Sequence, residues 1–365
     1  MTITFDRDTL IRNLNISSRF TSSRINTAQA LQGVYILVKD GLVNFYSTDL
    51  NIYCHINEKI DVKSEINVVV EPKKILEFLN LLNPGPLDIL FEKNSMSINQ
   101  GKSRGVFPVN SIDDFPLPPN ISIEFTKVST EFLIKNLPFL LFTASTDDAR
   151  PVLTGVNFVP SGDEIVMVST DGFRLSVVKE NSKTDFPSMI IPAFFLKELV
   201  KLIEKQAKVD FSYSEKDKIV CFRFDNIEVF SRIIDGQFPP YEKVIPESKT
   251  STAKVSRQDL IRNTKLISIF ARDYSNVVVY SFSKAGLIIS PKKEANSENS
   301  TVQEIEYDGE PVKVAFNHKY VSDFLNSTDS KDIIIELLRS DSPVVFRSET
   351  DKSFIHVIMP VRIQE

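Results

Sequence analysis

The chain has 365 residues, of which 42% are hydrophobic and 25% charged, so it is globular and not intrinsically disordered. No apolar run reaches about 18 residues and the first residues show no signal-peptide pattern, which argues against a membrane-spanning or secreted chain. Two cysteines, Cys54 and Cys221, are too few for a disulfide scaffold and fit a reducing cytoplasm, while the net charge of −5 argues against a protein that coats nucleic acid.

Six helices alternate with β-rich segments along the chain. The helices are predicted at residues 5–20, 71–82, 129–145, 192–208, 256–270 and 316–326. The second and fourth begin with Pro72 and Pro192, since proline is tolerated in the first turn of a helix. In the fifth helix, an apolar stripe is predicted at Leu260, Ile261, Leu266, Ile267 and Phe270.

The segments between the helices predict antiparallel strands. Residues 164–170 form one strand that leads into the turn dipeptide Asp171-Gly172. Residues 219–224 and 227–230 form a hairpin around Asp225-Asn226, and residues 277–282 and 333–338 are further strands. This alternation indicates the α+β class, with two helices and antiparallel sheet in each domain.

Several short patterns recur at a period of roughly 120 residues. The first is Leu-Ile-Arg/Lys-Asn, at residues 10–13, 133–136 and 260–263. The segments that begin the second helix of each unit align on Pro72, Pro192 and Asn317. Thr48-Asp49 recurs as Thr170-Asp171, and Phe115-Pro116 recurs as Phe238-Pro239. Because several ordered patterns share one period, the chain is predicted to be three homologous domains, at residues 1–122, 123–249 and 250–365.

Catalytic and metal-binding patterns are scarce. Cys54-His55 is the one Cys/His pair, but adjacent strand residues face opposite sides of a sheet, and no second pair completes a zinc site. We therefore expect Cys54 to be a buried thiol and His55 to be an imidazole on the surface. Gly101-Lys102-Ser103 resembles the end of a phosphate-binding loop, but Met96 stands where that loop needs glycine. No catalytic residue, metal or cofactor is therefore predicted.

The charges are unevenly distributed between helices and the rest of the chain. The six predicted helices carry 14 Lys and Arg against 9 Asp and Glu, so the remainder of the chain has a net charge of −10. Taken alone, this distribution favours helical cations that are simply solvated. If the helices share one surface, however, that surface could contact a polyanion although the whole molecule is acidic.

Three tandem units of this kind resemble the bacterial DNA sliding clamp, the β subunit of the DNA polymerase III holoenzyme. The most specific segment is residues 169–176 (STDGFRLS), close to the family's T-D-G-H-R-L-A. Residues 357–363 (VIMPVRI) are similar to the family's V-M-P-M-R-L ending, and residues 235–241 (DGQFPPY) to D-G-R-F-P-D-Y. The resemblance covers the whole chain.

The resemblance implies a ring. Two subunits would join head to tail into a closed homodimer of six domains, with helices lining the hole and sheet on the outside. Double-stranded DNA would pass through without sequence-specific contacts. The ring would tether the replicative polymerase, the clamp loader and repair polymerases through short peptides, which makes it a processivity factor and not an enzyme.

The family also implies where the sites lie. The peptide groove, between the second and third domains, would comprise Thr170, Gly172, Phe173, Arg174, Leu175, Pro239, Lys243, Val244, Ile358, Met359, Pro360, Val361 and Arg362. The DNA-binding residues would be Arg24, Lys73, Arg150, Lys197, Lys201, Arg262 and Lys265. The dimer interface would pair Lys74, Phe78 and Arg104 of the first domain with Ile269, Phe270 and Glu304 of the third.

Three departures from the family pattern fall at the groove. Phe173 stands in place of the usual histidine, and Lys243 stands where arginine is common. Gln364 and Glu365 extend past the usual end of the chain, where Glu365 would repel acidic peptides. Peptide preference is therefore left open.

Two alternatives stay open at this point. One is a clamp-fold interaction scaffold that is not loaded at replication forks, and the other is a hydrolase with unrecognised carboxylates. The mass in solution and retention on circular DNA would discriminate between them.

Overall fold

The computed structural model describes residues 2–23, 28–60, 65–110, 112, 114–119, 124–206, 208–271, 275–292 and 299–362. They form two compact units: Met1–Glu131 with Glu198–Ile233 (unit 1), and Phe132–Lys197 with Ile234–Glu365 (unit 2). Each unit is described by itself. None of the helices in the described ranges is long and apolar enough to cross a membrane.

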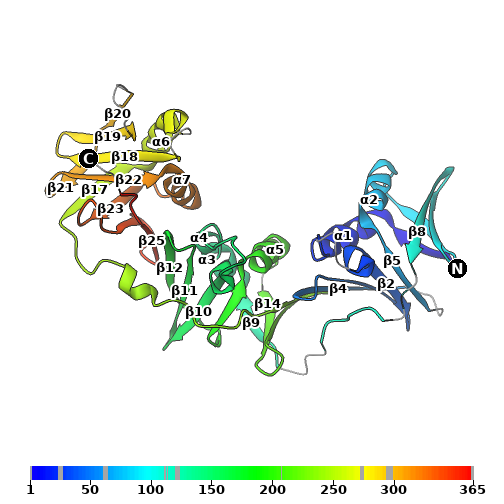
Figure 1. Ribbon diagram of the computed structural model, residues 1–365. Helices are drawn as coiled ribbons and strands as arrows, with labels where there is room; N and C mark the ends of the chain where they lie inside the picture. Colours follow the sequence, from blue (N-terminus) through cyan, green and yellow to red (C-terminus); the bar gives the residue numbers. More distant parts are fainter. Residues whose placement is uncertain are drawn as a thin grey trace. The chain divides into compact units, whose positions relative to one another are not determined.

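Unit 1 is built on one antiparallel sheet of twelve strands, in the order β1-β6-β7-β8-β5-β2-β3-β4-β16-β15-β14-β9. The strands are β1 Thr2–Asp6, β2 Val34–Lys39, β3 Leu42–Thr48, β4 Ile52–Lys59, β5 Ile66–Val70, β6 Pro86–Phe91, β7 Ser95–Gln100, β8 Ser103–Asn110, β9 Thr126–Ser129, β14 Lys208–Ser214, β15 Ile219–Phe224 and β16 Ile227–Arg232. The helices are α1 Arg7–Ser18, η1 Gln29–Gln32 and α2 Pro72–Leu81. Helices α1 and α2 pack on each other, and α1 also packs on the sheet (Figure 1).

Unit 2 contains a nine-stranded and a four-stranded antiparallel sheet, in the orders β13-β10-β11-β12-β25-β24-β23-β17-β21 and β20-β19-β18-β22. The strands are β10 Gly155–Ser161, β11 Glu164–Thr170, β12 Arg174–Asn181, β13 Met189–Pro192, β17 Ser251–Ser256, β18 Val277–Ser283, β19 Gly286–Pro291, β20 Thr301–Gln303, β21 Glu306–Asp308, β22 Val312–Asn317, β23 Asp332–Leu337, β24 Val344–Ser348 and β25 Phe354–Ile358.

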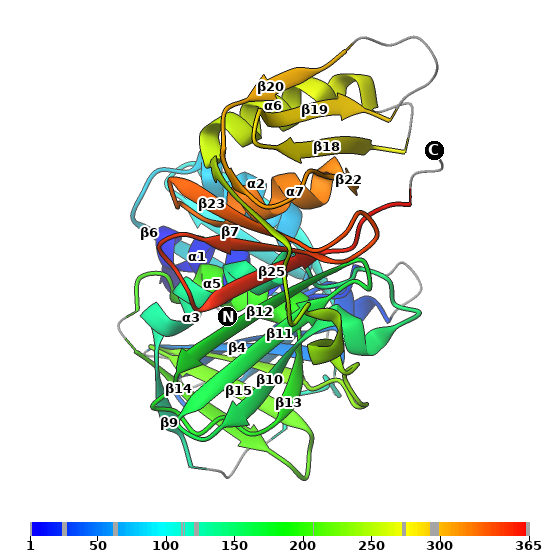
Figure 2. The ribbon, with the colours of Figure 1, turned by 90° about the vertical axis from the view of Figure 1, so that its left-hand side faces the viewer.

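The helices of unit 2 connect these sheets. They are α4 Pro138–Leu141, η2 Pro151–Thr154, η3 Tyr241–Val244, α6 Arg257–Ala271 and α7 His318–Ser327, and α3 Thr130–Asn136 and α5 Ala193–Ile203 have residues in both units. Helix α7 contacts both β22 and β25, so it joins the two sheets. The C-terminal strand β25 lies beside β12 of the second repeat (Figure 2), which makes the large sheet continuous across two repeats.

The repeated tetrapeptide has a packing role in every copy. Its leucine and its asparagine are buried each time: Leu10 and Asn13, Leu133 and Asn136, Leu260 and Asn263. Residues three apart share one face of a helix, so both side chains point into the core. The buried amides donate hydrogen bonds, from Asn13 to Glu58 (3.1 Å), from Asn136 to the Phe132 carbonyl (2.9 Å) and from Asn263 to Gln303 (3.3 Å).

The predicted helices and strands are found, with several differences. Helix α1 begins at Arg7 because Phe5 and Asp6 belong to β1, and α5 ends at Ile203 although a helix was predicted to residue 208. The helix predicted at residues 129–145 is divided into α3 and α4, because Pro138 has no N–H to donate within the helix. Pro192 ends β13 instead of opening α5. Of the stripe predicted on α6, Leu260 and Ile267 are buried, whereas Leu266 and Phe270 are exposed.

The two ambiguous motifs are part of the sheets. Gly101 and Lys102 form the turn between β7 and β8, where Gln100 pairs with Ser103 and Gly101 has φ +59°. Cys54 is buried, as expected, and burial raises the pKa of its thiol. His55 is not a surface residue: its side chain is 16% exposed and lies between Asn44 (2.9 Å) and Glu228 (3.1 Å).

Candidate functional site

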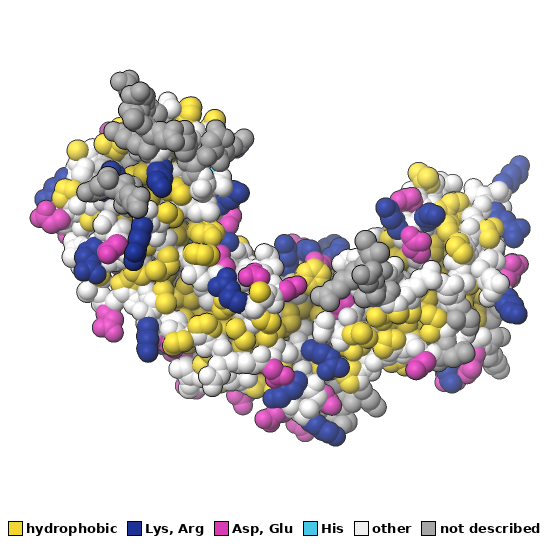
Figure 3. Space-filling view, viewed as in Figure 1, with side chains coloured by type: hydrophobic (Ala, Val, Ile, Leu, Met, Phe, Trp, Pro, Cys, Tyr) yellow, Lys and Arg dark blue, Asp and Glu magenta, His cyan; other side chains and the backbone are white. Residues whose placement is uncertain are grey.

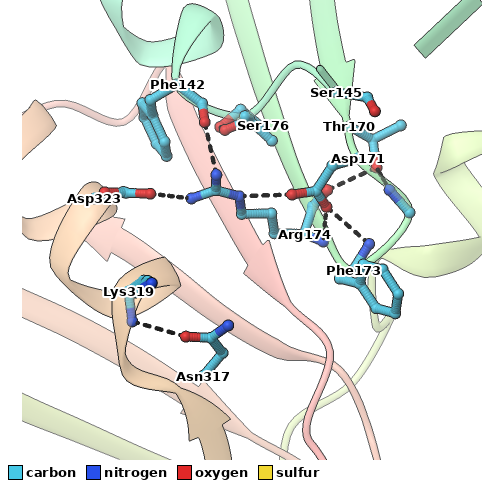
Figure 4. Close-up of polar contacts among 12 residues, drawn as sticks. Phe142, Ser145, Thr170, Asp171, Phe173, Arg174, Ser176, Asn317, Lys319 and Asp323 are labelled. Atoms are coloured by element: carbon cyan, nitrogen blue, oxygen red, sulfur yellow. Dashed lines mark hydrogen bonds and ion pairs between the residues drawn. The ribbon is translucent and has the colours of Figure 1, made fainter. Parts of the chain in front are cut away.

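The turn between β11 and β12 is held by its own side chains (Figure 4). Thr170 Oγ1 donates to the Arg174 carbonyl (2.6 Å) and accepts from the Gly172 amide (3.0 Å). Asp171 Oδ1 accepts from the amides of Phe173 (2.9 Å) and Arg174 (3.0 Å). Gly172 adopts φ +91°, which favours glycine. The turn leaves the Phe173 side chain 58% exposed at the end of the sheet.

Arg174 is enclosed by groups from three elements. Its guanidinium donates to Asp171 (3.0 Å), to Asp323 of α7 (2.6 Å) and to the Phe142 carbonyl (2.8 Å), as Figure 4 shows. It also lies 4.5 Å from the ring centroid of Tyr320. With a side chain only 10% exposed, Arg174 links β12 to α7. Its role is to position the turn.

The floor beside this turn is aliphatic. In the β12–β25 ladder Arg174 pairs with Ile358 and Leu175 with Val357. A buried cluster on this sheet contains Val168, Leu175, Val177, Val345 and Val357, and Phe238, Tyr241 and Ile245 pack against it. Burial raises the pKa of Tyr241 to about 12. The result is a buried apolar cluster at which two repeats meet, covered by these half-buried side chains.

The groove residues predicted in segment 239–244 face solvent and do not pack against the buried cluster. Pro239, Lys243 and Val244 are exposed, whereas their neighbours Phe238 and Tyr241 are half-buried against the floor. Phe238 and Tyr241 were therefore missed as groove residues, although both lie within the motif D-G-x-F-P-x-Y. The signal that could have found them is the aromatic character of these positions in an otherwise polar linker.

The C-terminal segment closes the other side of the groove. The Met359 amide donates to the Phe173 carbonyl (2.9 Å), and the Val361 amide donates to the Ala315 carbonyl (2.8 Å). Met359, Pro360 and Val361 are half-buried, whereas Arg362 is exposed. The structure thus brings together the turn, the start of β12 and the C-terminal segment. Gln364 and Glu365 lie outside the described residues.

A buried polar network lies beneath the floor. His356 is fully buried, and its Nδ1 lies 2.9 Å from Ser176 Oγ, which is 2.7 Å from Thr143 Oγ1. Burial, together with the nearby charge of Arg174, holds the pKa of His356 well below its ordinary value. The imidazole is therefore neutral at pH 7. Among the described residues, its Nε2 has no hydrogen-bond partner.

The predicted DNA-binding residues lie mostly on helices. Lys73 is exposed on α2, Lys197 and Lys201 on α5, and Arg262 and Lys265 on α6. Lys201 is paired with Glu198 (2.6 Å) and Arg262 with Asp259 (2.7 Å). On the face seen in Figure 3, the coloured cations and carboxylates are interspersed. Arg24 lies outside the described residues.

Arg150 is placed differently from the other predicted DNA contacts. Its Nη2 donates to the Asp171 carbonyl (3.3 Å), and its Nε lies 3.7 Å from Asp147. A Cβ on Gly172 would lie 3.0 Å from Arg150 Nη1. Arg150 is thus adjacent to the turn between β11 and β12.

The predicted interface residues lie near two strand edges. In unit 1, Phe78 contacts Phe107 edge to face (5.6 Å between centroids) beside Arg104 of β8. In unit 2, Ile269 and Phe270 are 60% and 41% exposed on α6, and Glu304 is exposed next to β20. β20 pairs only with β19 among the described strands. β8 pairs with β5 only at its last two residues, which leaves the edge of its first part open.

Comparisons with known proteins fit this architecture. Models of the DNA polymerase III beta subunit match the chain over residues 1–119 (N-terminal domain), 127–240 (central domain) and 242–362 (C-terminal domain). The beta sliding clamp of Synechocystis sp. is 28% identical over 97% of both chains. The DNA polymerase III beta subunit of Thermotoga maritima has the same fold, with a TM-score of 0.92 over all of both chains at 22% identity.

A sliding clamp of Bartonella birtlesii solved with bound griselimycin aligns over all of both chains, at 25% identity and a TM-score of 0.91. Fold and site therefore define a sliding clamp. The chain belongs to the DNA polymerase III beta subunit family, which confirms the resemblance inferred from its motifs.

Proposed function

We propose that this protein is a non-enzymatic processivity clamp, which encircles duplex DNA as a ring-shaped homodimer in the cytoplasm and tethers replication and repair proteins through its groove. The observation that carries the proposal is the match of all three repeats to the three domains of one clamp family. The predicted domains at residues 1–122, 123–249 and 250–365 are part of the same proposal.

The open strand edges support the dimer. An unpaired edge invites another strand to extend the sheet, and β8 and β20 each offer one. Lys74 and Arg104 beside the first edge are cationic, whereas Glu304 beside the second is anionic. Ile269 and Phe270 supply apolar surface. Gel filtration should therefore give about twice 41.4 kDa, and Ile269→Glu should give monomers.

The exposed helical cations support sequence-independent contact with DNA. Phosphate contacts release counterions, so each one should add about 0.9 to the slope of log affinity against log salt. The ion pair of Arg262 with Asp259 is exposed and weak, so it would not prevent such contacts, whereas Lys201 is paired with the buried Glu198. Replacing Lys73, Lys197 and Lys265 together by Gln should lower that slope by roughly 3.

The aliphatic floor supports a peptide groove. Apolar anchors such as Leu and Phe would pack on the exposed Phe173 and on the half-buried Phe238 and Tyr241, which cover the cluster around Leu175. Phe173→Ala should therefore weaken binding of a peptide with a Leu-Phe anchor by about tenfold, as expected for loss of an aromatic contact. Griselimycin, the ligand of the Bartonella relative, is a suitable competitor in this assay.

The topological experiment tests the clamp itself. With a clamp loader and ATP, the protein should remain on nicked circular DNA and be lost once the circle is cut. Retention that does not depend on cutting would contradict a ring and favour an interaction scaffold.

A further inference from the structure

A separate cavity of about 640 Å³ lies in unit 2, next to the groove. Its wall is formed by the loop before β22, the loop between β23 and β24, and the C-terminal segment. Pro360, Val361 and Arg362 of that segment line the cavity, whereas Phe173 and Leu175 of the groove do not. The predicted peptide groove includes Pro360, Val361 and Arg362, but no predicted function uses Lys313, Arg339 or the rest of the cavity wall.

The wall is fixed by backbone hydrogen bonds. The Val361 amide donates to the Ala315 carbonyl (2.8 Å), which attaches the C-terminal segment to β22. The Thr250 amide donates to the Leu337 carbonyl (2.9 Å), and Ser251 Oγ donates to the Glu310 carbonyl (3.0 Å). The cavity is therefore preformed, so a ligand would lose little free energy in ordering it.

Cations outnumber carboxylates on this wall. Lys313, Arg339 and Arg362 line it together with Glu310 and Asp341. Asp341 lies 3.6 Å from Arg339, which leaves Lys313 and Arg362 with no ion-pair partner within 4 Å in the described part of the chain. All three cations are exposed, so their hydrogen-bond donors can reach an anion in the cavity.

One short chain segment connects the groove turn with the cavity wall. Met359 is bonded to Phe173 at the groove turn, and the next residue, Pro360, already lines the cavity. Consecutive residues are about 3.8 Å apart, so an extended peptide anchored near Phe173 reaches the cavity within a few residues. A flanking segment of the same peptide could therefore occupy it.

We propose that this cavity binds acidic residues that flank the apolar anchor of a bound peptide. The inference rests on the proposed function, because it needs a peptide in the groove. Carboxylates would accept hydrogen bonds from Lys313, Arg339 and Arg362. An acidic peptide is favoured over a DNA phosphate backbone because Glu310 and Asp341 interrupt the cations, which would oppose a continuous polyanion.

The test compares two peptides by fluorescence anisotropy on the full chain. Both carry the same Leu-Phe anchor, and one carries three Asp and the other three Asn beside it, placed on either side in separate versions. The Asp peptide should bind about tenfold more tightly at low salt in one of the two placements, as expected for two or three exposed ion pairs. Raising the salt to about 0.5 M should remove most of this preference.

A charge-reversal variant locates the effect. Lys313→Glu combined with Arg339→Glu should abolish the preference for Asp, whereas Lys284→Glu, an exposed lysine at the β18–β19 turn, should preserve it. The affinity for the Asn peptide should change less than twofold in both variants, which also shows that the groove remains folded.

The possible failures are distinguishable. If neither peptide binds, the groove and the cavity proposal are both wrong. If both peptides bind equally in the unmodified chain, or the preference survives in the double variant, only the cavity proposal is wrong. A double variant that loses DNA affinity but keeps the peptide preference would assign these cations to DNA and overturn the inference.

Discussion

Strands of neighbouring repeats pair at two places in the molecule. The two ladders share backbone hydrogen bonds but carry different side chains. The first seam is the β4–β16 ladder of unit 1, and the second is the β12–β25 ladder of unit 2. At the first seam Thr48 Oγ1 donates to the Ile52 carbonyl (2.7 Å), as Thr170 does to Arg174 at the second (2.6 Å). A backbone hydrogen bond is also repeated. The Arg232 amide donates to the Asn51 carbonyl at the first seam (2.8 Å), as the Met359 amide does to the Phe173 carbonyl at the second (2.9 Å).

The side chains on the two ladders differ at equivalent positions. His55 pairs with Glu228 at the first seam, where Val177 pairs with Ile355 at the second. Hydrogen bonds to His55 and Arg223 hold the pKa of Glu228 below its ordinary value despite its burial. Arg223 in turn lies 3.9 Å from the ring centroid of Phe125. The first seam thus satisfies its own polar groups.

The consequence concerns which seam can hold a ligand. An apolar anchor that entered the first seam would desolvate a polar network and form no hydrogen bonds with it, which is unfavourable. At the second seam it would pack on the exposed Phe173 and on the half-buried apolar side chains that cover the ladder. The two ladders have similar backbone pairing, so the ability to bind an apolar ligand depends on their side chains.

The largest expected effect is at the two arginines. Arg174→Leu removes the partner of Asp171 and Asp323 at a site only 10% exposed, so it should lower the free energy of unfolding by about 3–5 kcal/mol. Arg223→Leu, whose side chain is 43% exposed, should cost no more than about 1 kcal/mol. Urea unfolding followed by circular dichroism measures both. Equal losses would mean that Arg174 does not link β12 to α7.

Exchanging equivalent side chains between the two ladders tests the comparison directly. Val177→His places an imidazole where no counterpart of Asn44 or Glu228 exists, so it should cost about 2–3 kcal/mol and abolish peptide binding. His55→Val with Glu228→Ile removes both members of a pair at once, so its cost should stay near 1 kcal/mol. Peptide binding should be unchanged in that variant, and a loss of affinity would show that the first seam takes part in the groove.

Sequence patterns predicted much of this arrangement and missed what depends on long-range contacts. The repeat of Thr48-Asp49 at Thr170-Asp171 helped to predict homologous domains, and a turn was predicted at Asp171-Gly172, because Thr and Asp bond to the backbone next to them in sequence. The enclosure of Arg174 could not be predicted, since Asp323 is 149 residues away. Nor could the position of Arg150, because its neighbour Asp171 lies 21 residues away, in the turn between β11 and β12. The groove, DNA and interface residues remain predictions.

Lowering the pH should reduce the free energy of unfolding in two successive steps, one from each seam. His356 beneath the second seam has a lowered pKa, so below pH 6.5 the unfolded chain binds a proton that the folded chain does not. Stability should then fall by about 1.4 kcal/mol per pH unit. Glu228 at the first seam also has a lowered pKa, so its contribution is lost only as the pH falls below 4.5. His356→Phe should flatten the first decline and Glu228→Gln the second in urea titrations; a single decline that neither variant changes would contradict this order.

The smallest expected effect concerns the turns. Leu50 and Gly172 occupy equivalent positions and both adopt positive φ, +78° and +91°. A leucine in this conformation costs about 1 kcal/mol or more, and Leu50 is already 46% exposed, so Leu50→Gly should be neutral or stabilise the fold by up to about 1 kcal/mol. Gly172→Ala should destabilise it by about 1 kcal/mol and also displace Arg150, whose Nη1 would lie 3.0 Å from the new Cβ. Paired thermal unfolding of the two variants measures the sign. Opposite signs are expected because one backbone turn carries different side chains, and a stabilising Gly172→Ala would mean that the two turns are not equivalent.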